Sequence, residues 1–183
     1  MKLVQEINFI ENKELQTKLS LMSIAVFVGF LIFSPVVLLL LFRICKASDI
    51  PFQIDFLTII RSFIIFLVCL PLHELIHALG FKFFMPDSQI KFGFKAGMLY
   101  ASAAGVVFSR KHFIYIVLAP LVVITVLIVI YALISQHFVS AYWALALHTT
   151  GCVGDVYYVI QLCKHKEVSH VKDTNVGAEF LCK

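Results

Sequence analysis

Four long apolar stretches limit what this chain can fold into more than any other feature of its sequence. They cover residues 20–42, 56–81, 113–134 and 141–163, and each reaches the roughly 20 residues that a helix needs to cross a hydrocarbon core. The chain of 183 residues is 61% hydrophobic, against roughly 45–50% for an average soluble domain. We therefore predict an all-α integral membrane protein of four transmembrane helices, folded as one domain over residues 1–183, with the lipid bilayer as its first partner.

The basic residues predict how such a bundle is oriented. Three of the 15 Lys and Arg residues (Arg43, Lys46 and Arg61) lie around the first loop, and none lies in the third loop. The other twelve belong to the N-terminal segment, the second loop and the C-terminal tail. By the positive-inside rule, both termini and the second loop lie in the cytosol. Because this charge is dispersed over loops, we expect no nucleic-acid partner.

The second span contains an H-E-x-x-H pattern formed by His73, Glu74 and His77. Residues i and i+4 share one face of a helix, so both imidazoles can bind one metal ion while Glu74 stands beside it. Zinc hydrolases use two neutral nitrogens to hold the ion and a carboxylate to take a proton from water. The pattern predicts Zn²⁺ as the cofactor, His73 and His77 as ligands, and Glu74 as the catalytic base.

The apolar surroundings favour a functional role for this pattern. An acidic side chain at the centre of a membrane costs roughly 2.5–3.5 kcal/mol on insertion scales, so such residues are retained mainly for function. The alternative is a polar cluster that joins helices by hydrogen bonds and binds no metal. Haem ligation is disfavoured, because histidines one turn apart on one helix cannot take opposite axial positions.

The fourth span offers two candidates for a third metal ligand, Asp155 and His148. With a rise of 1.5 Å per residue, His77 and His73 lie roughly 7 and 13 Å from the cytosolic end of their helix, and Asp155 lies at roughly 13 Å in its own. His148 would lie roughly 10 Å deeper, unless the helix breaks at one of the nearby glycines. We therefore predict Asp155 as the third ligand, with His148 as the less favoured alternative or a supporting residue.

The segments outside the spans are short. Residues 90–100 alternate apolar with charged or small side chains, which predicts a small cytosolic β-hairpin that turns near Ala96 and Gly97. This hairpin either offers an edge to an extended substrate segment or only covers the site. Residues 1–19 predict a surface helix or a solvated leader, and the tail, residues 164–183, is a candidate partner for the hairpin strands.

The five cysteines form no C-x-x-C pair. This spacing predicts neither a disulfide framework nor a thiolate zinc site. We interpret the cysteines as small buried side chains and free thiols.

Several short motifs occur in an order that resembles a known family. H-E-L-I-H-A-L in the second span is followed by K-F-G-F, L-A-P, a G-D pair and V-K-D-T. This order resembles the bacterial family of unknown function labelled putative zincin peptidases and, more distantly, is similar to the three-helix core of site-2 proteases. The resemblance implies His73 and His77 as zinc ligands, Glu74 as the base, Asp155 as the third ligand, and a bacterial plasma membrane location. Relatives tend to show asparagine at the place of His148.

Together, the motif and the spans predict a zinc-dependent membrane metallopeptidase. It would cut a peptide bond of a membrane-associated protein or peptide at or near the cytosolic side. The alternative is a non-hydrolytic metal-binding membrane protein, a sensor or regulatory accessory that keeps the fold. The sequence indicates neither the substrate nor the oligomeric state.

Overall fold

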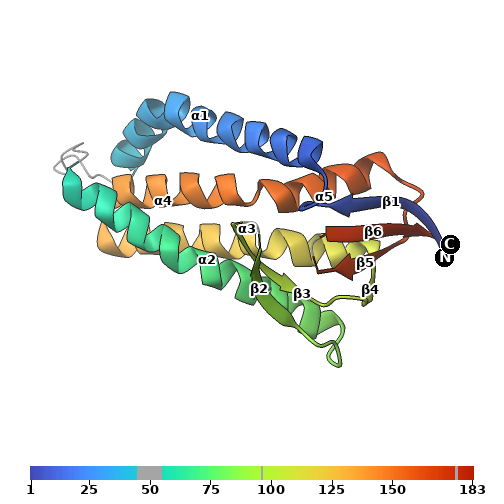
Figure 1. Cartoon of the computed structure of the whole chain (residues 1–183). Coiled ribbons are helices and arrows are strands. Elements are labelled where there is room, and N and C mark those ends of the chain that lie inside the picture. The colour runs from blue at the N-terminus through green and yellow to red at the C-terminus, as the bar shows by residue number, and fades with distance from the viewer. Residues whose placement is uncertain (45–54, 96, 176) are drawn as a thin grey trace.

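A computed structural model describes residues 1–44, 55–95, 97–175 and 177–183 of the chain. In these residues five helices form an elongated bundle, with strands gathered toward one end (Figure 1). The helices are α1 (Lys13–Ile44), α2 (Phe56–Phe84), α3 (Arg110–Ser135), α4 (Phe138–Gly151) and α5 (Val153–Lys164). Most of the predicted first loop, including Lys46, lies outside the described residues.

Three of these helices, α1, α2 and α3, are long and apolar enough to cross a membrane. Their outer surfaces are apolar as well, since residues such as Ile32 and Phe33 of α1 are more than 60% exposed. Water would make such a surface costly, whereas lipid chains would cover it without cost. The helices therefore support the prediction of a membrane protein.

The predicted fourth span is not one continuous helix. The structure divides it at Cys152 into α4, with 14 residues, and α5, with 12 residues. Gly151 and Gly154 flank the break, and glycine costs roughly 1 kcal/mol relative to alanine inside a helix. Neither half alone reaches the length of a transmembrane helix, so the prediction of four long helices is not confirmed.

The all-α prediction is also too simple, because the described residues include two sheets. A four-stranded antiparallel sheet has the order β1-β6-β5-β4, and a second sheet is the hairpin β2-β3. The strands are β1 (Lys2–Asn8), β2 (Lys91–Lys95), β3 (Met98–Ser102), β4 (Val107–Ser109), β5 (His170–Thr174) and β6 (Gly177–Cys182). The predicted hairpin is thus present, and Ala96, where its turn was predicted, lies outside the described residues.

The predictions for the two terminal segments were wrong. Residues 2–8 form neither a surface helix nor a solvated leader, because β1 pairs antiparallel with β6 and buries Ile7, and residues 13–19 are the first turns of the long helix α1. The tail pairs with β1 and β4 rather than with the hairpin. Pairing between strands separated by most of the chain leaves no local periodic signal, which explains the error.

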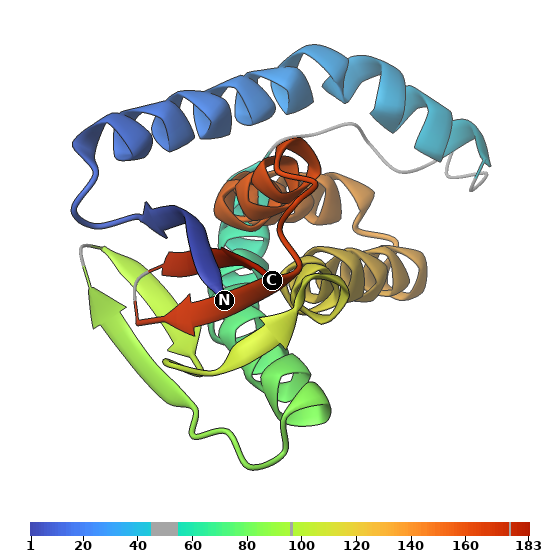
Figure 2. The same ribbon diagram turned by 90° about the vertical axis from the view of Figure 1, so that its right-hand side faces the viewer.

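The four-stranded sheet brings both chain ends to one end of the bundle, where they lie close together (Figure 2). We call this the sheet end. The largest buried cluster of the described residues lies here and joins the sheet to α3 and α5 through residues such as Phe108, Phe113 and Leu162, each at most 1% exposed. The arrangement fixes α5 against α3, and this determines where the polar residues of α5 point.

Candidate metal centre

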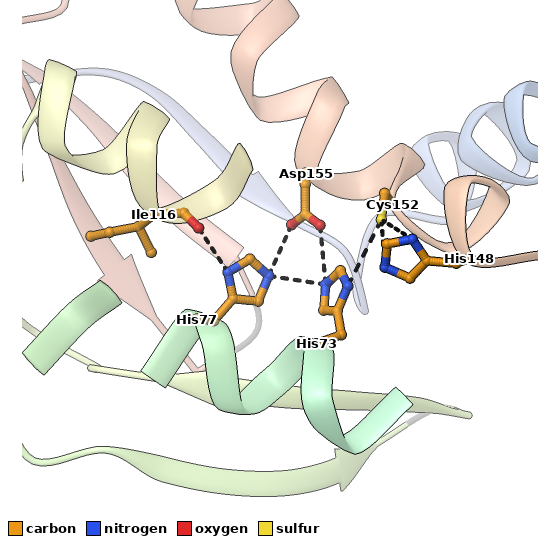
Figure 3. A network of polar contacts seen from close by, with 6 residues as sticks. All are labelled: His73, His77, Ile116, His148, Cys152 and Asp155. Carbon is orange, nitrogen blue, oxygen red and sulfur yellow. Dashed lines mark hydrogen bonds and ion pairs between the residues drawn. The ribbon is translucent and has the colours of Figure 1, made fainter. Parts of the chain in front are cut away.

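His73 and His77 lie one turn apart on α2 and point toward α5 (Figure 3). Their Nε2 atoms are 3.0 Å apart. His77 is buried, and the side chain of His73 is 14% exposed. The i, i+4 spacing of the sequence motif therefore brings two imidazole nitrogens to one point inside the bundle.

Asp155 reaches the same point from the first turn of α5. Its Oδ2 lies 3.1 Å from Nε2 of His73, and its Oδ1 lies 3.4 Å from Nε2 of His77. Tetrahedral zinc with bonds of about 2.0–2.1 Å places neighbouring N and O ligands about 3.3 Å apart. The three side chains fit one zinc ion, and the positive N-terminus of α5 adds a favourable field for the carboxylate.

The second ring nitrogen of His77 is also held. Nδ1 lies 3.1 Å from the backbone oxygen of Ile116 in α3. An N–H at Nδ1 would donate to this carbonyl and leave the Nε2 lone pair free for a metal, as outer hydrogen bonds commonly do in zinc sites. Gly80 permits the close approach of α2 and α3, since a Cβ atom there would lie 3.3 Å from Cγ1 of Ile116.

Glu74 follows His73 on α2 and is half-buried. Its carboxylate lies near both histidine rings and near the backbone N–H of Ala101 in β3. The hairpin packs along α2 at this position. Glu74 therefore lies beside the three candidate ligands without being one of them, as a general base requires.

Asp173 in β5 attaches the hairpin to the four-stranded sheet. Its Oδ2 accepts hydrogen bonds from Oγ of Ser102 at 2.8 Å and from the N–H of Ala103 at 2.7 Å. Burial raises the pKa of this carboxyl to about 7, although both hydrogen bonds act in the opposite direction. The sequence analysis gave Asp173 no role, because nothing in the sequence shows that the tail meets the end of β3.

His148 lies closer to the site than an unbroken helix would allow. Its ring is 5.7 Å from the ring of His73, measured between centroids. The break at Cys152 turns the chain there, and the thiol of Cys152 lies between the two rings (Figure 3). Its Sγ is 3.5 Å from Nε2 of His148 and 3.8 Å from Nδ1 of His73. The sequence analysis missed this thiol, because its only signal was a cysteine four residues after a histidine.

Comparison with known proteins gives one match. A family model described as "Putative zincin peptidase" matches residues 66–169, which include the H-E-x-x-H pattern, the hairpin and Asp155. No curated protein and no solved structure matches the chain. The matched segment covers more than half of the sequence and contains the whole candidate centre, and the chain therefore belongs to this family of zincin-like peptidases.

Proposed function

We propose that the protein is a zinc-dependent metallopeptidase that hydrolyses a peptide bond of a membrane-associated protein or peptide. One observation carries this proposal. Nε2 of His73, Nε2 of His77 and the Asp155 carboxylate converge with separations of 3.0, 3.1 and 3.4 Å, and Glu74 stands next to them. The family description supports the same reaction class.

The residues of the site have two kinds of proposed role, metal binding and proton transfer. His73, His77 and Asp155 would hold the ion, which supplies Lewis-acid polarisation when bound and keeps one position open. Glu74 takes the proton of the attacking water and passes it to the leaving amine. The Ala101 N–H lies beside the Glu74 carboxylate, and the His77 contact with Ile116 keeps that imidazole in the tautomer that can bind metal.

The topology supports four passages through the membrane. β1 precedes α1, β4 precedes α3, and both strands lie in one sheet with β5 and β6. If α1 and α3 lead away from the sheet end across a bilayer, α2 must bring the chain back, and so must α4 and α5 together. The fourth passage would then be a broken helix, which membranes tolerate where protein surrounds the break.

The orientation proposed from the sequence fits this arrangement. Twelve of the 15 Lys and Arg residues lie before α1 or in its first two turns, between the last turn of α2 and the first turn of α3, or from the last residue of α5 onward. These are the regions of the sheet end, so the positive-inside rule places the sheet end and both termini in the cytosol. Cleavage would occur at or near the cytosolic side of a bacterial plasma membrane.

Replacement of the proposed base tests the hydrolytic function. We expect Glu74→Gln to abolish cleavage of a membrane-protein substrate by the purified chain, with bound zinc close to one ion per chain, because Glu74 is not a ligand. Glu14→Gln, at an exposed position of α1, is the matched control and should leave both values unchanged. Substrates can be found by comparing the membrane proteomes of cells with the wild-type chain and with Glu74→Gln.

The alternative, a non-hydrolytic metal-binding protein, makes a different prediction. There, Glu74→Gln would have no effect in cells, whereas His73→Ala would act through loss of the metal. A Glu74→Gln variant that behaves like the wild type in cells would overturn the peptidase proposal. Purified protein without stoichiometric metal would overturn both.

A further inference from the structure

A second group of metal-binding side chains lies on the far side of His73 from Asp155. It consists of His73 Nδ1, His148 and Cys152, whose donor atoms all lie within 4.8 Å of one another. Cys152 is fully buried and His148 is 4% exposed. Figure 3 shows the His73 ring standing between the two groups, with Nε2 facing Asp155 and Nδ1 facing the sulfur.

The distances within this group are those of weak hydrogen bonds to sulfur, and they also suit ligands of one metal ion. Zinc bonds of about 2.3 Å to sulfur and 2.0–2.1 Å to nitrogen place tetrahedral S and N ligands about 3.5 Å apart. The Cys152 sulfur lies 3.5 Å from one imidazole nitrogen of His148 and 3.8 Å from Nδ1 of His73. The donors come from two sides, since His73 belongs to α2 whereas His148 and Cys152 flank the end of α4.

We propose that His73, His148 and Cys152 form a second metal position that takes a thiophilic divalent ion such as Zn²⁺, Co²⁺ or Cd²⁺. Two imidazoles and one thiolate form a donor set that favours these ions over Mg²⁺ or Ca²⁺. Like the catalytic sites of some zinc enzymes, it offers three protein ligands and leaves one position for water or an anion. This position is separate from the group of His73, His77 and Asp155, although the two share His73.

Because both metal positions use His73, this residue affects how many protons are released when an ion binds at the second position. Cys152 binds as a thiolate and releases one proton. When an ion already holds Nε2 of His73, binding at Nδ1 requires that ring to lose its remaining N–H proton, so His73 becomes an imidazolate between two ions. The second ion should therefore release two protons and bind more weakly than the first.

Titration with Co²⁺ tests the proposal, because a thiolate bound to Co²⁺ gives a charge-transfer absorption that imidazole and carboxylate ligands do not give. The full chain is purified in detergent, stripped of metal, kept reduced without added thiols, and titrated. We expect two ions per chain at saturation, with the charge-transfer band developing as the second ion binds. Cys152→Ser and His148→Gln should each remove the band and one equivalent of bound ion.

Two further variants separate this position from its surroundings. Cys69→Ser replaces another buried thiol and should keep the band and both equivalents. Asp155→Ala removes a proposed ligand of the first position and should keep the band, so loss of the first site does not remove the signal of the second. Absence of the band from the wild type at saturating Co²⁺, or its persistence in Cys152→Ser, would overturn the proposal.

Discussion

Pro120 follows Ile116 by four residues in α3, and this spacing leaves the Ile116 carbonyl without its helical donor. A helical carbonyl at position i normally accepts the N–H of residue i+4, and proline has no N–H. The freed oxygen is the one that lies 3.1 Å from Nδ1 of His77. Pro120, the proline of the L-A-P motif, thus gives α3 an acceptor that can orient a proposed metal ligand on α2.

Replacement of Pro120 should weaken metal binding. In Pro120→Ala the new backbone N–H competes with His77 for the Ile116 oxygen, so His77 is less firmly held in its metal-binding tautomer. Loss of such outer partners typically costs 10–100-fold in metal affinity, and we expect a fall of about that size. Competition with a chromophoric chelator measures the affinity. Pro35→Ala, which changes a proline inside α1, is the matched control, and an equal fall in both variants would contradict the argument.

Neutralisation of Asp155 should have a larger effect than the loss of Pro120. Asp155→Asn keeps the size of the side chain but removes the negative charge that zinc requires of an oxygen ligand. We expect the zinc affinity to fall by more than about 100-fold, beyond the range for outer partners, and cleavage to stop. Metal analysis after dialysis against a zinc buffer measures this. Asp87→Asn, at an exposed position, should retain full zinc, and retention of zinc by Asp155→Asn would remove Asp155 from the ligand set.

The stability of the sheet end should fall as the pH rises from about 4 to about 7. Burial raises the pKa of Asp173 from 3.8 to about 7, so in this interval the folded chain binds a proton that the unfolded chain releases. The free energy of unfolding then decreases by up to about 1.4 kcal/mol for each unit of pKa difference. Thermal melts across this range should show the slope, and Asp173→Asn should reduce it. Asp87→Asn serves as the control. If Asp173→Asn leaves the slope unchanged, other titrating groups cause the pH dependence.

Gly177 is required for the pairing of β1 with β6. A Cβ atom at this position would lie 1.8 Å from the backbone oxygen of Ile7, so Gly177→Ala must push the two strands apart. We expect a loss of about 1–3 kcal/mol or more, seen as a lower melting temperature and faster proteolysis near residue 8. Gly29→Ala in α1, where an added Cβ meets nothing within 4 Å, should neither lower the melting temperature nor speed this proteolysis, because alanine favours a helix over glycine. Equal melting temperatures for the two variants would show that the strands can shift at little cost.

The sequence predicted those parts of the structure that depend on local pattern. The apolar stretches gave the three long helices, the alternation around Phe92 and Phe94 gave the hairpin, and the i, i+4 spacing gave the paired orientation of His73 and His77. Each of these depends on residues close in sequence. The relation to site-2 proteases and the catalytic role of Glu74 stay predictions.

The sequence could not predict features that depend on distant contacts. The pairing of β1 with β6 joins residues more than 160 positions apart. The role of Pro120 depends on which helix its freed carbonyl faces, and the place of Cys152 depends on the break after α4. The depth predicted for His148 from the helical rise was too great, because that prediction assumed an unbroken helix. The two glycines beside Cys152 marked the place where the helix could break.

The break at Cys152 has a further consequence, which concerns the supply of a reactant. Each hydrolysed bond consumes one water molecule, and the hydrocarbon core of a membrane contains almost none. The last carbonyls of α4 find partners at the break, since His148 and Thr149 accept the N–H of Cys152 and Thr150 accepts the hydroxyl of Ser23. The first N–H groups of α5 have no acceptor one turn earlier in their own helix. The break thus leaves backbone N–H groups beside Asp155 that can donate to a water molecule, the reactant that the proposed hydrolysis consumes.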